Sequence, residues 1–164
     1  MTTVAMMRTI KTFFAGRERF MKVVIVLLLA AIFLPGCQTT GSYEEPPLPT
    51  DVKIEQPDNH VPPEQAAYSG IWYGTFGREL YVKVVVERVY PPFAYMIYSW
   101  GTGIHQKHAG WTRVTGAFDG EELNASVGRG VELNMRMQEN GTMYATYIHR
   151  DWGFTSATAL RRVE

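Results

Sequence analysis

The second half of the chain is organised by an alternation of apolar and polar residues with a period of two. The clearest example is residues 131–138 (VELNMRMQ), in which every second side chain is apolar. Successive side chains of a β-strand point to opposite faces, so this pattern predicts a strand that is buried on one face only. Residues 139–141 (ENG) then predict a turn, and residues 142–148 (TMYATYI) predict a second strand that pairs with the first as a hairpin.

The same pattern predicts six further strands between residue 70 and the end of the chain. They cover residues 71–76, 80–90, 94–100, 111–118, 123–127 and 155–163, and glycines or Pro91-Pro92 separate them. No segment in this part of the chain has the 3.6-residue period of an amphipathic helix. The sequence therefore predicts an all-β fold of about eight short strands.

Eight short antiparallel strands in sequence order favour a small up-and-down barrel, because closing a sheet removes its exposed edges. A β-sandwich is the alternative, since its strands have the same period. An eight-stranded barrel is just wide enough to be filled by side chains or to hold one small ligand.

The beginning of the chain has a different pattern. Residues 23–34 (VVIVLLLAAIFL) are an unbroken apolar run between Met21-Lys22 and Pro35-Gly36-Cys37. A basic start, a short apolar stretch and a small residue before a cleavage position are typical of an export signal. The run is shorter than the roughly 20 apolar residues that a transmembrane helix needs. We therefore expect residues 1–36 to be an N-terminal extension and a signal helix, with Met1 and Met21 both open as the true start.

The residues at the end of this run, Leu34-Pro35-Gly36-Cys37, resemble the lipobox of bacterial lipoproteins. In that family a lipid is attached to the cysteine thiol, and the signal is cut just before it. Leu34 and Gly36 match the pattern, whereas Pro35 departs from it. The resemblance implies that Cys37 carries three acyl chains. Because Gln38 stands where inner-membrane retention typically uses Asp, it also implies an outer-membrane location facing the periplasm.

Residues 37–66 form a polar, proline-rich segment after this cysteine. The segment holds six of the nine prolines and six acidic residues, against the single basic residue Lys53. Such a composition cannot bury enough apolar surface to offset the entropy of ordering, and prolines favour extended conformations. We expect a disordered linker that holds the domain of residues 67–164 clear of the lipid headgroups.

The two ends of this domain carry a second resemblance. Gly70-Ile71-Trp72 begins the first predicted strand, and Arg161 and Arg162 lie in the last one. This is similar to the calycin pattern of lipocalins, avidins and related barrels, in which a G-x-W motif starts the barrel and an arginine from the end of the chain packs over the Trp ring. The resemblance implies that Trp72 and Arg161 or Arg162 close one end of the barrel. The domain is shorter than a typical lipocalin, so we expect a tight barrel.

Three further segments together resemble a small uncharacterised module of bacterial exported proteins. They are residues 72–76 (WYGTF), 98–101 (YSWG) and 110–113 (GWTR). This resemblance implies no activity by itself.

The charge of the chain argues against one class of partner. The whole chain has 16 Lys and Arg against 16 Asp and Glu, but after Cys37 there are 11 basic and 15 acidic residues. Binding of nucleic acid needs a clustered basic face that neutralises phosphates. We therefore expect no nucleic-acid partner.

The domain contains no recognisable catalytic motif. Its serines lie outside any G-x-S-x-G motif, and no glycine-rich phosphate loop precedes a helix. His105 and His108 lie three residues apart in a glycine-flanked loop and could supply two metal ligands, with His149 or Asp151 as a third. No cysteine or acidic cluster accompanies them, so we expect a solvated loop, no bound metal, no cofactor and no enzymatic activity.

Aromatic residues indicate where a ligand or a partner would bind, because flat amphipathic rings suit sugars and peptides as well as a protein core. The candidate surface consists of Tyr98, Trp100, His105, His108, Trp111 and Trp152. The sequence thus predicts a membrane-anchored lipoprotein whose barrel is a non-enzymatic binding or accessory module for a small ligand or an envelope protein. An envelope assembly factor and an inhibitor of a lytic enzyme are the alternatives.

Overall fold

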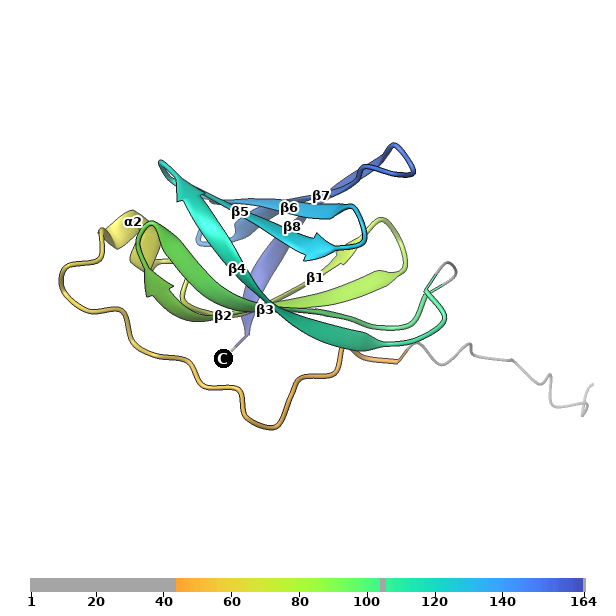
Figure 1. Cartoon of the computed structure of the whole chain (residues 1–164), viewed down its shortest axis with the longest axis horizontal. Coiled ribbons are helices and arrows are strands. Elements are labelled where there is room, and N and C mark those ends of the chain that lie inside the picture. Colours follow the sequence, from red (N-terminus) through yellow and green to blue (C-terminus); the bar gives the residue numbers. More distant parts are fainter. Residues whose placement is uncertain (1–43, 104–105, 164) are drawn as a thin grey trace, which may run out of the picture. The chain divides into compact units, whose positions relative to one another are not determined.

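The computed structural model describes residues 44–103 and 106–163, so the predicted signal segment, the lipobox and Cys37 lie outside the described residues. The chain forms a closed antiparallel barrel in which each strand pairs with its neighbours in sequence and the last strand pairs with the first (Figure 1). The strands are β1 (Gly70–Phe76), β2 (Leu80–Tyr90), β3 (Phe93–Trp100), β4 (Gly110–Asp119), β5 (Glu122–Gly128), β6 (Val131–Met137), β7 (Met143–His149) and β8 (Phe154–Val163).

The predicted all-β barrel is therefore confirmed, and each predicted strand agrees with the observed one to within one residue at either end. The described residues contain one helical turn, α2 (Pro63–Ala66), directly before β1. No helix in the described ranges is long and apolar enough to cross a membrane.

The middle of the barrel is filled by the inward-facing residues of the strands. Four strands contribute residues whose side chains are at most 1% exposed: Trp72, Met96, Leu133 and Leu160. Gly116 in β4 makes this packing possible, because a Cβ at this position would lie 2.8 Å from Cδ1 of Leu123 and 3.1 Å from the sulfur of Met96. Here the interior is as tight as we expect for so short a domain.

One end of the barrel, which we call the closed end, is plugged by the residues that precede β1. The Tyr68 hydroxyl lies 2.6 Å from the carbonyl oxygen of Glu121 and 3.0 Å from that of Met135, so it ties the plug to the β4–β5 turn and to β6. The indole nitrogen of Trp72 donates a hydrogen bond to the Tyr68 carbonyl at 2.8 Å. Tyr68 and Trp72 are both fully buried.

Arg162, near the end of β8, completes this end of the barrel. Its guanidinium carbon lies 4.4 Å from the centre of the Trp72 ring. The same guanidinium donates to the Ala67 carbonyl at 2.6 Å and to the Ser69 carbonyl. Gly70 has φ +128°, and a Cβ here would lie 2.5 Å from the Arg162 Nη1 atom, so only glycine allows the arginine to approach this closely.

Residues 44–57, which we call the strap, run along the outside of β2, β3 and β4. Near its start, the Glu44 N–H donates to the Thr102 hydroxyl at 2.7 Å, and the Glu44 carbonyl accepts from the Thr102 N–H at 3.2 Å. Further along, the Ser99 hydroxyl donates to the Pro47 carbonyl. The Glu55 N–H donates to the Glu87 carbonyl at 2.7 Å.

Ion pairs add to the hold of the strap. Lys83 lies 2.7 Å from Glu45, and Arg113 lies 2.8 Å from Asp51 and 3.1 Å from Glu87. The hydrogen bonds from these two cations lower the pKa of the Glu45 and Asp51 carboxyls. At least one partner of each pair is well exposed to solvent, so the pairs are weak.

The strap corrects one part of the linker prediction. Its prolines are extended, as the composition indicates, but Pro46 is buried and the strap lies on the barrel instead of running free of it. Val85 and Ile97 face outward from β2 and β3, and both are fully buried because the strap covers this wall. Composition indicates whether a segment can form its own core, but not whether another part of the chain offers it partners.

Replacing the closing arginine tests the plugged end. Arg162→Ala removes a cation–π contact and two hydrogen bonds to carbonyl oxygens, so we expect the free energy of unfolding to fall by about 2 kcal/mol. The measurement is urea denaturation followed by circular dichroism. Arg161→Ala is the matched control, because the Arg161 side chain has no hydrogen bond or ion pair among the described residues, and it should have little effect. Equal losses for the two variants would contradict this account.

Replacing Ser99 tests the strap. Ser99→Ala removes the hydrogen bond to the Pro47 carbonyl, which contributes about 1 kcal/mol, so opening of the strap should become roughly fivefold more frequent. Amide hydrogen exchange at Thr102 and Glu55 measures this opening, because both N–H groups are bonded across the strap. The control is Ser126→Ala, on the exposed wall of β5. Unchanged exchange in Ser99→Ala would show that the strap is held without this bond.

Candidate functional site

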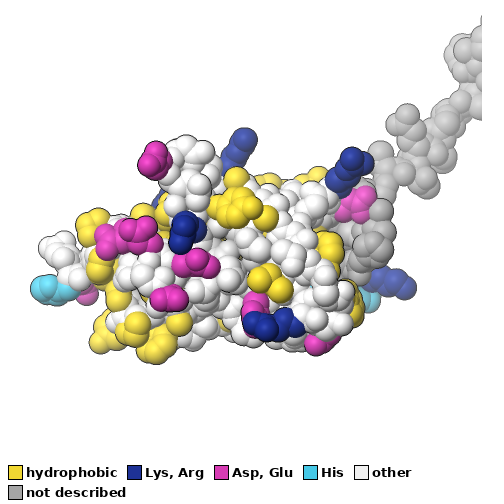
Figure 2. Space-filling view, turned by 90° about the horizontal axis from the view of Figure 1, so that it is seen from above, with side chains coloured by type: hydrophobic (Ala, Val, Ile, Leu, Met, Phe, Trp, Pro, Cys, Tyr) yellow, Lys and Arg dark blue, Asp and Glu magenta, His cyan; other side chains and the backbone are white. Residues whose placement is uncertain are grey.

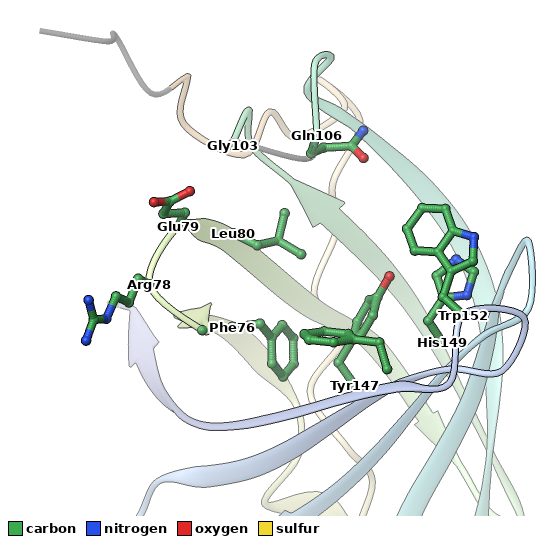
Figure 3. Close-up of a pocket in the computed structure, with 11 residues that line it drawn as sticks. Phe76, Arg78, Glu79, Leu80, Gly103, Gln106, Tyr147, His149 and Trp152 are labelled. Atoms are coloured by element: carbon green, nitrogen blue, oxygen red, sulfur yellow. The ribbon is translucent and has the colours of Figure 1, made fainter.

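The end of the barrel opposite the plug, which we call the mouth, holds a pocket of about 640 Å³ (Figure 3). The walls of the pocket are formed by the turns and strand ends at the mouth. These are the β1–β2 turn, the described parts of the β3–β4 connection, the end of β7 and the β7–β8 turn. The pocket is lined by Phe76, Gly77, Arg78, Glu79, Leu80, Gly103, Gln106, Tyr147, His149, Trp152 and Phe154.

The floor and one wall of the pocket are aromatic. Phe76 and Phe154 occupy the inward-facing positions nearest the mouth on β1 and β8, and Tyr147 lies on the inward face of β7, two residues before His149. The ring centres of Phe76 and Tyr147 are 5.4 Å apart, and those of Tyr147 and Phe154 are 6.2 Å apart. Phe154 remains 51% exposed, so the wall offers apolar surface to a molecule that enters the pocket. Leu80 adds an aliphatic group on the facing side, as Figure 3 shows.

A stacked pair of rings forms the other wall. The imidazole of His149 and the indole of Trp152 are parallel to within 3°, with their centres 4.0 Å apart (Figure 3). His149 is only 7% exposed and Trp152 is 75% exposed, so the indole covers the imidazole and presents much of its own surface to solvent. The Nδ1 atom of His149 is buried and has no hydrogen-bond partner among the described residues. A buried nitrogen without a hydrogen-bond partner is costly to the folded state.

Polar groups lie at the rim of the pocket. Arg78 and Glu79 come from the β1–β2 turn, and Gln106 comes from the β3–β4 connection. In Figure 3 the Arg78 and Glu79 side chains extend away from the aromatic floor. The pocket is therefore apolar inside and charged at its edge, an arrangement that orients an amphipathic molecule.

The predicted aromatic surface does not form one surface. Tyr98 lies inside the barrel and is 4% exposed, with its ring 5.7 Å from that of Trp100. Burial raises the pKa of Tyr98, and the nearby Tyr147 adds to the effect. Its hydroxyl has no hydrogen-bond partner in the described part of the chain. Trp100 is half-buried and donates its indole N–H to the His108 carbonyl at 3.0 Å.

The remaining candidates are dispersed. The His108 side chain is exposed, and His105 lies outside the described residues. Trp111 is 43% exposed on the outer wall of β4, with the Arg113 guanidinium carbon 5.6 Å from its ring centre. Of the predicted surface residues that the structure describes, only Trp152 lines the pocket.

Sequence reasoning missed the aromatic floor of the pocket. Phe76 lies four residues after Trp72, and Tyr147 lies four residues after Met143. Residues separated by an even number of positions along a strand lie on the same face, so Phe76 and Tyr147 face inward like Trp72 and Met143. That spacing could have identified both residues. It could not have shown that β1, β7 and β8 bring them together at one end.

A second depression, on the outer wall of β4, β5 and β6, is polar. It is lined by Asp119, Glu122, Asn124, Ala125, Ser126, Glu132 and Asn134. Arg136 lies 3.7 Å from Glu122 and Arg150 lies 2.6 Å from Glu132, so two of the carboxylates already have cationic partners. No group of three His, Cys, Asp or Glu side chains in residues 44–103 and 106–163 is placed to hold a metal ion.

The surface is mixed in charge on the face that Figure 2 shows. Acidic and basic side chains are interspersed there, and hydrophobic side chains form separate patches between them. The described residues on this face form no continuous basic patch. The mouth pocket is thus the feature of the described chain that is best suited to a ligand.

Together the fold and the site define a plugged eight-stranded barrel with an apolar pocket at its open end. No protein-family model, no curated protein and no solved structure matches the chain.

The buried hydroxyl of Tyr98 gives a direct test of the interior near the mouth. Tyr98→Phe removes a hydroxyl that has no hydrogen-bond partner among the described residues, so we expect the free energy of unfolding to rise by about 1 kcal/mol. Urea denaturation measures the change. Tyr68→Phe is the control with the opposite sign, because the Tyr68 hydroxyl is hydrogen-bonded to the backbone. A loss of stability in Tyr98→Phe would mean that its hydroxyl is bonded after all.

Proposed function

We propose that this protein is a lipid-anchored envelope protein whose barrel is a non-enzymatic binding module for a small, largely apolar ligand. The observation that supports this proposal best is the difference between the two ends of the barrel. One end is sealed by Tyr68, Trp72 and Arg162, and the other opens into a pocket of about 640 Å³. That volume is typical of pockets that hold small molecules, which span roughly 300–1,000 Å³.

The lining of the pocket indicates the chemistry of the ligand. Aromatic rings of Phe76, Tyr147 and Phe154 favour a flat ring or a hydrocarbon chain, because apolar contact with them removes surface from water. On the other wall, the Trp152 indole is 75% exposed and favours a flat group that stacks on it. Charged groups at the rim favour a polar head that remains near solvent. A small amphipathic molecule combines these three properties.

The contact between Trp72 and Arg162 supports a calycin-type relationship as part of this proposal. An arginine from the end of the chain lies over the tryptophan of a G-x-W segment in β1, as the resemblance implies. The location, in the outer membrane and facing the periplasm, is proposed from the lipobox-like residues 34–37 and from Gln38.

Two exposed tryptophans provide a matched test of the pocket. A chain of residues 38–164 contains every strand, the plug and the strap, and its binding to a fluorescent naphthalene sulfonate can be measured by titration. Trp152 lines the pocket and Trp111 lies on the outer wall. Trp152→Ala should raise the Kd about tenfold, since about 50 Å² of apolar contact contributes roughly 1.3 kcal/mol. Trp111→Ala should leave the Kd unchanged.

Two results would contradict a binding function at this site. One is the absence of saturable dye binding to the unsubstituted chain at high micromolar concentration. The other is an equal loss of affinity in the two tryptophan variants. Separately, native mass spectrometry of the protein purified from its own membranes would identify any molecule that it retains.

A further inference from the structure

We propose that the mouth of the barrel is a membrane-docking face, held against the lipid surface by the strap. The mouth face consists of the turns at residues 77–79, 129–130 and 150–153. This inference rests on the lipid anchor of the proposed function, and it adds an orientation: the pocket opens toward the bilayer.

The place where the strap begins provides the first argument. Glu44 is bonded to Thr102, which follows the end of β3 at the mouth. In Figure 1 the start of the described chain, in orange, lies toward the same end as the β1–β2 and β7–β8 turns, and α2 lies at the opposite end. The described chain therefore begins at the mouth, seven residues after Cys37.

The length of that chain provides the second argument. Seven residue steps separate Cys37 from Glu44, so they reach at most about 25 Å when fully extended. A flexible chain of this length has a typical end-to-end distance of roughly 15 Å. By comparison, the 11 residues of β2 extend about 35 Å along the strand, or about 27 Å along the barrel axis for a tilt of roughly 40°. An anchor at Cys37 thus reaches the mouth easily, but it is too short to let the closed end face the membrane.

The chemistry of the mouth provides the third argument. Trp152 is 75% exposed and Phe154 is 51% exposed. Tryptophan is enriched at the headgroup level of membranes, where its ring meets both apolar and polar surroundings. The exposed Arg78 and Arg129 lie in the adjacent turns, and they would attract anionic lipid headgroups.

Charge also distinguishes the two ends. The mouth has the acidic residues Glu44, Glu79 and Asp151 among its cations, and Arg150 is paired with Glu132. The turns and the plug at the closed end carry acidic residues but no Lys or Arg of their own. The cations near this end lie close to the ends of strands β2, β6 and β8: Arg88, Arg136, Arg161 and Arg162. The acidic residues there are Asp58, Glu64, Glu121 and Glu139. An anionic membrane would therefore repel the closed end more than the mouth.

This orientation gives a ligand in the bilayer a direct route to the pocket. An amphipathic molecule could pass from the lipid surface between the exposed rings of Trp152 and Phe154 without crossing the aqueous phase. The sequence alone predicts a long linker that holds the barrel clear of the lipid headgroups. The proposed arrangement differs, because the strap leaves only residues 38–43 between the anchor at Cys37 and the barrel.

The two ends of β6 allow a matched test. Arg129 lies in the turn before β6 at the mouth, and Glu139 lies in the turn after it at the closed end. Both are exposed and charged. Arg129→Cys and Glu139→Cys would each be made in the full chain and labelled with a fluorophore after lipidation, because Cys37 is the only native cysteine and its thiol is then consumed. The labelled proteins are reconstituted into vesicles of phosphatidylethanolamine and phosphatidylglycerol that contain a lipid with a nitroxide on its headgroup.

We expect the label at residue 129 to be quenched several-fold more strongly than the label at residue 139. Inserting about twenty Gly and Ser residues between Ser42 and Tyr43 should reduce this difference strongly, because the anchor would then reach past the whole barrel. Equal quenching at the two ends, or stronger quenching at residue 139, would overturn the proposed orientation.

Flotation of the vesicles separates this outcome from a failure of the proposed function. If the labelled chain floats with the vesicles but shows no difference between the two labels, the orientation is wrong and the anchor remains. If the chain does not float, the anchor and the orientation are both wrong. The dye titration of residues 38–164 uses no membrane, so it tests the pocket independently of either result.

Discussion

The contact between Trp72 and Arg162 is the constraint on which the rest of the molecule depends. It joins the first strand to the last one, and it fastens both to the carbonyl groups of the plug. With this end closed by side chains, the apolar residues of the middle strands can pack without exposed edges or solvent access. The opposite end needs no such plug, so its inward-facing aromatic residues remain available to a ligand.

The strands could be predicted from the sequence, because alternation with a period of two is a local property of each segment. The number and order of the strands favoured a closed barrel, but a β-sandwich has the same period, and only the pairing of β1 with β8 decides between the two. The strap could not be predicted in the same way, because its partners lie far away in the chain: Ser99 is 52 residues from Pro47, and Thr102 is 58 residues from Glu44. Proline content determined that these residues are extended, and tertiary contacts determined where they lie.

The candidate site was predicted only in part, and the reason is geometric. Trp100 on β3 is paired with Gly110 on β4, and Trp111 is paired with Ser99, so the two tryptophans occupy neighbouring positions in the sheet. Because they are one residue out of register, their side chains point to opposite faces. A set of aromatic residues near one loop therefore divides between the interior and the outer wall. Trp152 belongs to the pocket because the β7–β8 turn folds it over His149, a contact between residues three apart that the sequence pattern alone does not reveal.

The position of Glu44 at the mouth has a practical consequence for handling the protein. Any affinity tag or reporter joined to the amino-terminal side of the strap would be delivered to the rim of the pocket, where it could compete with a ligand. The carboxyl-terminal end of β8 pairs with Ile71 at the plugged end, far from that rim. Fusions to the carboxyl terminus are therefore the appropriate choice for any study of binding.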